Sequence, residues 1–142
     1  MPASELLKEQ WLFAESLPRL IDHAITLGYK VTLGEVYRSN EQAELNAIGF
    51  SGRAAVAKLI EKQFPLLAAK IADNRGNGIR NSVHCLRLAV DLQLFDASGK
   101  WLQEAYPYTL LADFWESLGP THRAGVRFGD PAHFSIEFNG AK

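Results

Sequence analysis

An alternating apolar run in the middle of the chain restricts the fold more than any other feature. In LRLAVDLQLF, residues 86–95, aliphatic side chains recur at every second position, which is the period of a β-strand with one face in a core. The alternation predicts a buried aliphatic face made of Leu88, Val90, Leu92 and Leu94. The opposite face contains Ala89, Asp91 and Gln93. A strand entering a core therefore places the Asp91 carboxylate on its second face.

Several segments have the apolar spacing of amphipathic helices. The three-to-four spacing predicts helices over residues 5–28, 40–47, 51–74 and 108–119. Pro18 has no amide hydrogen to donate, so we expect a second helix to open there with Ser16 as its cap. An interruption is expected near Pro65 for the same reason.

Shorter segments predict the rest of the sheet. Strands are expected over residues 29–39 and 133–138, with a short partner strand near Trp101 and Leu102. The first of these should point Val31, Leu33 and Val36 inward around a bulge at Gly34. Glycine-bearing loops are expected over residues 74–82 and 120–132. Because helices and strands mix without a regular βαβ alternation, the sequence predicts an α+β fold with a small antiparallel sheet flanked by helices.

Length and composition limit the classes of protein to consider. A chain of 142 residues is expected to form a single domain over residues 1–142. The net charge of −1 argues against a nucleic-acid partner, which would need a broad cationic face. The single cysteine, Cys85, excludes an internal disulfide and a cysteine-rich zinc knuckle. No apolar stretch approaches the roughly 20 residues of a membrane span, and no basic segment precedes an apolar one at the N-terminus. We therefore expect no membrane insertion, no signal peptide and a cytoplasmic origin.

Two strands are expected to present metal-binding side chains on one sheet face. Alternation in HFSIEF places His133 on the face opposite Phe134, and His84 precedes the first strand. His84, Asp91 and His133 together provide two imidazoles and one carboxylate. This is the ligand set of a catalytic zinc site that keeps a fourth position for water. Asp130, three residues before His133, is a candidate to contact that water.

Structural roles for the same residues stay open at this point. A single histidine is more often a hydrogen-bonded structural residue than a ligand, and Asp91 could instead hold the turn at Asn81. His23 and His122 are interpreted as structural or solvent-exposed. Cys85 is interpreted as a small buried hydrophobe, and Glu137 as an exposed strand residue.

One stretch resembles a motif of a zinc peptidase family. Ser82, His84, Ala89 and Asp91 match the pattern Ser-x-His-x-x-Gly-x-Ala-x-Asp. This family includes D-alanyl-D-alanine carboxypeptidases and the L-alanyl-D-glutamate endopeptidases that phages use as endolysins. Arg87 stands where the family commonly has glycine, so this side chain either points away from the metal or helps to bind substrate.

Two further elements follow the family pattern in the same order. Asp130 and His133 match its Asp-x-x-His motif, which is followed by an aromatic residue. Arg38, after an aromatic residue, and Gln42 match its arginine element. The resemblance extends over residues 30–138, and the length of the chain is similar to that of small single-domain phage endolysins. The segment RAGVRFGD departs from the family because it lacks the common tryptophan-glycine-glycine pattern.

The resemblance implies a role for each matched residue. It implies that zinc is bound by His84, Asp91 and His133, and that Asp130 is the catalytic base. Arg38 would contact substrate, with Gln42 and Arg87 as further substrate-binding candidates. A structural salt bridge from Arg38 to Glu35 or Glu41 is the alternative. The implied fold is that of D-alanyl-D-alanine peptidases and hedgehog-like domains, with the zinc site on the open face of the sheet.

These expectations define a function and its alternatives. The resemblance implies a zinc-dependent peptidase that hydrolyses the L-alanyl-D-glutamate bond of peptidoglycan stem peptides, as a monomeric phage-type endolysin without a separate wall-binding domain. Such a protein would stay in the host cytoplasm until it is released to the cell wall. A D-alanyl-D-alanine carboxypeptidase is the near alternative. A non-catalytic zinc-containing binding module or phage structural component is the alternative from another class, and Asp130 argues against it because a structural zinc site needs no extra carboxylate.

Overall fold

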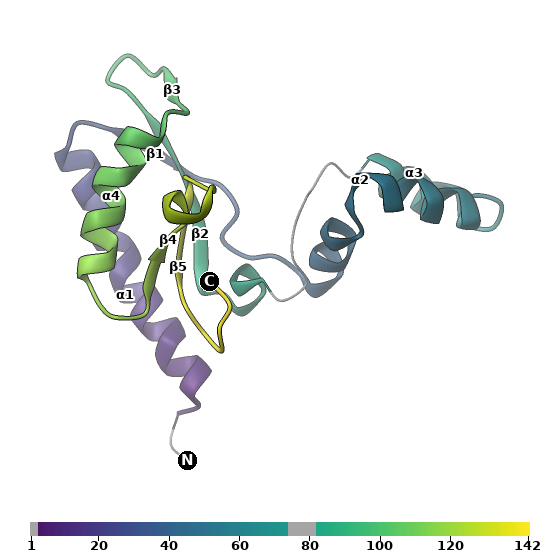
Figure 1. Ribbon diagram of the computed structural model, residues 1–142, viewed down its shortest axis with the longest axis horizontal. Coiled ribbons are helices and arrows are strands. Elements are labelled where there is room, and N and C mark those ends of the chain that lie inside the picture. Colours follow the sequence, from purple (N-terminus) through teal and green to yellow (C-terminus); the bar gives the residue numbers. More distant parts are fainter. Residues whose placement is uncertain (1–2, 74–81) are drawn as a thin grey trace.

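The chain folds into an α+β body from which a helical hairpin projects (Figure 1). A computed structural model describes residues 3–73 and 82–142. Its elements, with η for a 3₁₀ helix, are α1 (Glu5–Thr26), β1 (Lys30–Leu33), α2 (Asn40–Ile60), α3 (Pro65–Asp73), η1 (Val83–Leu86), β2 (Ala89–Phe95), β3 (Trp101–Leu102), α4 (Ala105–Ser117), β4 (His122–Ala124), η2 (Gly125–Phe128) and β5 (His133–Ile136). The sheet order is β1-β2-β5-β4 with β3 paired to β2, and every pairing is antiparallel. The predicted α+β class with an antiparallel sheet flanked by helices is confirmed.

The alternation in β2 builds the core of the body as predicted. All four aliphatic side chains of its inner face are fully buried: Leu88, Val90, Leu92 and Leu94. Phe134 of β5 joins them, and Trp115 of α4 packs edge-on against Phe134 with ring centroids 6.2 Å apart. Leu20 of α1 is part of the same cluster. The helices α1 and α4 therefore cover the aliphatic side of the sheet, and the polar side of β2 and β5 is left to the site.

The prediction that Pro18 opens a second helix is wrong, because α1 is continuous through it. Pro18 lies on the exposed side of α1, where Ala14, whose carbonyl loses its helical partner, is also exposed and accessible to water. Ser16, the expected cap, is buried instead and its hydroxyl lies 2.9 Å from His122 Nε2. Packing on both sides of the proline keeps one helix.

The sheet differs from the prediction at its edges. Leu33 is 51% exposed although it was expected to point inward, because β1 is an edge strand and ends at this residue. Val31 and Val36 do pack against the core. Beyond Leu33, Gly34 N donates to Asp91 O at 2.7 Å, which continues the pairing irregularly. The three-residue strand β4 lies inside the segment predicted as a loop, because so short a strand gives little alternation to detect.

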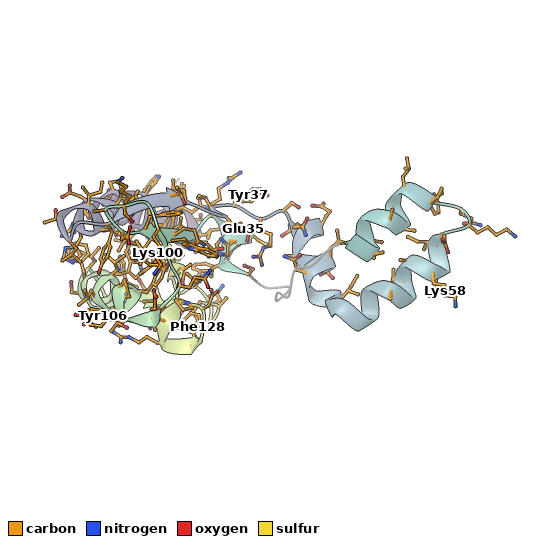
Figure 2. All side chains as sticks on the ribbon, turned by 90° about the horizontal axis from the view of Figure 1, so that it is seen from above. Glu35, Tyr37, Lys58, Lys100, Tyr106 and Phe128 are labelled. Carbon is orange, nitrogen blue, oxygen red and sulfur yellow. The ribbon has the colours of Figure 1, made fainter. Side chains whose placement is uncertain are left out.

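The hairpin of α2 and α3 has a small core of its own. Residues 40–60 form one helix rather than the two expected segments, and the predicted interruption is confirmed because α3 begins at Pro65. Figure 2 shows the hairpin extending away from the body, with Lys58 toward its far end. The loop predicted over residues 74–82 lies outside the described residues except for Ser82. Within the described ranges, no helix combines the length and the apolar character that crossing a bilayer requires.

Candidate metal centre

Strand register brings two of the predicted ligands together. Asp91 of β2 is directly opposite His133 of β5 in the antiparallel pairing, so their side chains share one face. The 3₁₀ helix η1 supplies His84 at the mouth of β2, and Ser82 caps this helix by accepting a hydrogen bond from His84 N at 3.2 Å. Sheet pairing and one short capped helix therefore bring the three side chains to one point.

The three potential ligand atoms are almost equidistant. His84 Nε2 lies 3.2 Å from His133 Nδ1 and 3.4 Å from Asp91 Oδ1, and His133 Nδ1 lies 3.6 Å from that oxygen. Ligand atoms about 2.0–2.1 Å from a tetrahedral ion are about 3.4 Å apart. The imidazoles are 3% and 5% exposed for His84 and His133, so solvent reaches the group from the carboxylate side. This buried group could hold a metal ion.

Hydrogen bonding leaves the site with unsatisfied polar atoms. Asp91 Oδ1, His84 Nδ1 and His133 Nε2 are all buried without a hydrogen-bond partner in the described ranges. Burial on its own would raise the pKa of Asp91, but the imidazoles of His133 and His84 outweigh it and hold that pKa well below its usual value. Asp91 is therefore an ionised carboxylate aimed at two imidazole nitrogens, as cation binding requires.

Asp130 is held beside the site by a tight turn. Its amide donates to Gly125 O at 2.8 Å, and its carbonyl accepts from His133 N at 3.0 Å. A side chain at Gly125 would place its Cβ 2.0 Å from Asp130 O and 2.7 Å from His133 Cβ, so only glycine fits. Asp130 is exposed and lines the same cavity of about 440 Å³ as the three ligands. Gly125 was not recognised from the sequence, although it lies within the turn that precedes Asp130.

Arg38 also lines this cavity, but its guanidinium is already paired. Its Nε donates to Glu35 Oε1 at 2.8 Å, and its Nη2 donates to Glu35 Oε2. The salt bridge considered as an alternative to substrate contact is thus present. Glu35 lies on the side of the body from which the hairpin projects (Figure 2). Gln42 does not line the cavity, and its side-chain amide donates to Asn46 Oδ1 at 2.8 Å within α2.

Arg87 points away from the three ligands. It ends η1 in the left-handed conformation with φ of 58°, which glycine adopts without strain. Its guanidinium carbon lies 5.0 Å from the ring centre of Tyr37, and both residues line a groove along α1 that includes none of the three ligands. The arginine in place of the usual glycine therefore leaves the metal centre uncrowded.

Two side chains of the cavity wall were missed from the sequence. Phe128 packs edge-on against His133 with ring centroids 5.9 Å apart, and Lys142 Nζ lies 5.3 Å from the Phe128 ring centre. Figure 2 places Phe128 on the body, apart from the hairpin. Neither residue belongs to a motif or a periodic pattern, so only the folded chain reveals them.

The remaining candidates have structural surroundings. His122 is buried and pairs with Ser16, and His23 stacks on Phe114 with ring centroids 4.0 Å apart. Glu137 forms an ion pair with Arg123 at 2.6 Å. Cys85 is half-buried rather than a buried hydrophobe.

Comparison with known proteins adds no assignment: no protein-family model matches the sequence, and no curated protein matches it significantly. The chemistry of the site is therefore argued from its own geometry.

Proposed function

We propose that the chain is a zinc-dependent peptidoglycan peptidase that hydrolyses the L-alanyl-D-glutamate bond of stem peptides, as a phage-type endolysin with the fold of D-alanyl-D-alanine peptidases. One observation supports this most directly. Three ligand atoms lie 3.2–3.6 Å apart in a cavity that Asp130 also lines. A structural metal site is normally closed by four protein ligands, whereas this group offers three within the described ranges, and the Asp130 side chain lines the same cavity.

The donor set fits zinc and hydrolysis. Zinc would be held by His84, Asp91 and His133, and it would supply an activated water and polarise the carbonyl to be attacked. Asp130 would accept the proton of that water and later return it to the departing amine. Asp130 is exposed and its carboxylate forms no ion pair with any other described residue, so this carboxylate is available for proton transfer.

Arg38 fits a supporting role on the cavity wall. Two of its nitrogens are engaged by Glu35, which fixes the plane of the guanidinium and leaves Nη1 without a partner in the described ranges. A fixed arginine presents a directed positive charge to a substrate carboxylate. Stem peptides have such carboxylates on D-glutamate and on the terminal D-alanine.

Product analysis tests the proposal. Purified protein would be incubated with bacterial wall sacculi, with and without a chelator, and the new termini identified by mass spectrometry. New L-alanine carboxyl and D-glutamate amino termini that vanish with chelator are expected. Free D-alanine would instead identify a carboxypeptidase. The absence of any product would contradict a peptidase and indicate a non-catalytic binding module.

Variants separate metal binding from proton transfer. Asp130→Ala is expected to retain zinc at about one ion per chain and to lose at least 100-fold in activity, whereas His84→Ala should lose both. Asp113→Ala is the matched control, because Asp113 of α4 is another exposed aspartate, and its carboxylate pairs with Arg127 of η2. Full activity in Asp130→Ala would contradict its role as the base.

A further inference from the structure

Two further cavities share wall residues with the cavity of the metal centre. Asp130 lines it together with a second cavity of about 230 Å³ that also includes Trp101. Ser82 and Ala141 line it together with a third cavity of about 340 Å³. The second and third cavities therefore adjoin the central cavity through these shared wall residues. Adjoining cavities of this kind can hold parts of a substrate that extend beyond the bond to be cut.

The cavity that Trp101 lines has the chemistry of a sugar site. Trp101 is 50% exposed, and its indole N–H donates to Gln93 Oε1 at 3.0 Å, which fixes the orientation of the ring. The Gln103 side chain provides a second amide in the same wall. A pyranose presents an apolar C–H face to an aromatic ring, and its hydroxyl and acetamido groups hydrogen bond to amides. Asp130 at the shared edge is the one charged residue that lines this cavity in the described ranges.

The central cavity has the positive charge. Lys142 lines it with its ammonium 5.3 Å from the Phe128 ring centre, and this ammonium has no ion-pair partner among the described residues. Arg38 lines the same central cavity. Substrate carboxylates are therefore attracted to the central cavity rather than to the Trp101 cavity. The two cavities thus differ in the groups they can recognise.

We infer that the Trp101 cavity binds the N-acetylated sugar ring to which the stem peptide is attached. The orientation rests on the proposed function: the L-alanine side, which is linked to the glycan, lies toward Trp101, and the D-glutamate carboxylate lies in the central cavity that Arg38 and Lys142 line. Sugar binding itself requires no hydrolysis. Trp101, Gln93 and Gln103 would then select wall fragments that keep their glycan.

Direct binding tests the sugar site. The probe is the disaccharide of N-acetylglucosamine and N-acetylmuramic acid without peptide, titrated into the full chain and followed by NMR shifts. Wild type is expected to bind in the millimolar range and Trp101→Ala at least 10-fold more weakly. Trp11→Ala is the matched control, because Trp11 is 53% exposed but lies on α1 and does not line the Trp101 cavity. No binding by wild type, or equal binding by Trp101→Ala, would overturn the inference.

A kinetic comparison tests the orientation separately. For Trp101→Ala, kcat/KM should fall about 10-fold on a disaccharide-tetrapeptide and less than 2-fold on the same tetrapeptide without sugar. Equal losses on both substrates would contradict the assigned direction. If wild type cleaves neither substrate, the proposed function fails, while the disaccharide titration still decides whether the sugar site exists.

Discussion

The body and the hairpin differ in how their apolar surface is used. In the body, sixteen buried hydrophobic residues form one cluster, and its largest members, Trp115 and Phe134, are fully buried. Among the side chains that the structure describes, the hairpin cluster buries Ala57, Ala68 and Ile71, while exposed fractions reach 83% at Leu59 and 82% at Leu66. All three metal-binding candidates belong to the body. The comparison indicates that the body sets the geometry of the site and the hairpin is held mainly by its own two helices.

The largest expected effect separates the two cores. Leu92→Ala should lower the free energy of unfolding of the body by about 2–5 kcal/mol, because it removes a fully buried side chain. Ile71→Ala should reduce helicity but leave the unfolding of the body within about 0.5 kcal/mol of wild type. All three tryptophans lie in the body, so tryptophan fluorescence during urea unfolding reports on it alone. An equal shift of this transition by Ile71→Ala would show that body and hairpin unfold as one unit.

Zinc should stabilise only one of the two regions. At zinc concentrations 1,000-fold above the dissociation constant, the body should gain about 4 kcal/mol of stability, because folded ligands bind the ion. The fluorescence-detected transition measures this gain in wild type and in His133→Ala, which should show none. A gain that persists in His133→Ala would mean that zinc binds elsewhere.

Helix caps provide a smaller, matched test. Ser39 caps α2 by accepting from Gln42 N at 3.1 Å, and Ser4 caps α1 by accepting from Leu7 N at 3.2 Å. Each replacement by alanine should cost about 1 kcal/mol. Ser39→Ala should speed amide hydrogen exchange in α2 alone, whereas Ser4→Ala should shift the unfolding of the body. Faster exchange in β2 after Ser39→Ala would contradict the separation.

The smallest effect is a pH dependence confined to the body. Burial lowers the pKa of His122, and Arg19 and Arg123 act in the same direction. Below the unfolded pKa of about 6.5, the His122 imidazole binds a proton in the unfolded chain but not in the folded chain. The contribution of His122 to the free energy of unfolding is therefore complete above this pH and decreases as the solution is acidified. Urea unfolding from pH 7.5 to 5.5, with chelator present, should show a weaker pH slope in His122→Gln than in wild type. Equal slopes would exclude His122 as the cause.

Sequence patterns were informative where a local period decides the structure. The alternation around Asp91 and around His133 predicted which side chains face the core, and the register of β2 and β5 then placed both on one face. Pro18 was misinterpreted because its helical context depends on packing against distant residues. β4, which contains His122, was missed because tertiary pairing rather than alternation defines so short a strand.

The surroundings of the site depended on contacts between distant segments. The pairing of Arg38 with Glu35 could be considered from the sequence, since the two are three residues apart, but not chosen over substrate contact. Phe128, Lys142 and Trp101 belong to no motif, and only folding brings them into two adjoining cavities that share Asp130. Three-dimensional proximity, rather than residue type, identifies these positions.

The chain segments that connect the hairpin to the body meet at the base of the hairpin. Arg38 N donates to His84 O at 3.3 Å, so the chain leaves and rejoins the body at one hydrogen-bonded point. Such closure makes residues 40–81 an exchangeable cassette: a short glycine-rich connector or a foreign targeting peptide could be grafted there while the sheet stays intact. Protein engineers could then replace the hairpin without redesigning the sheet.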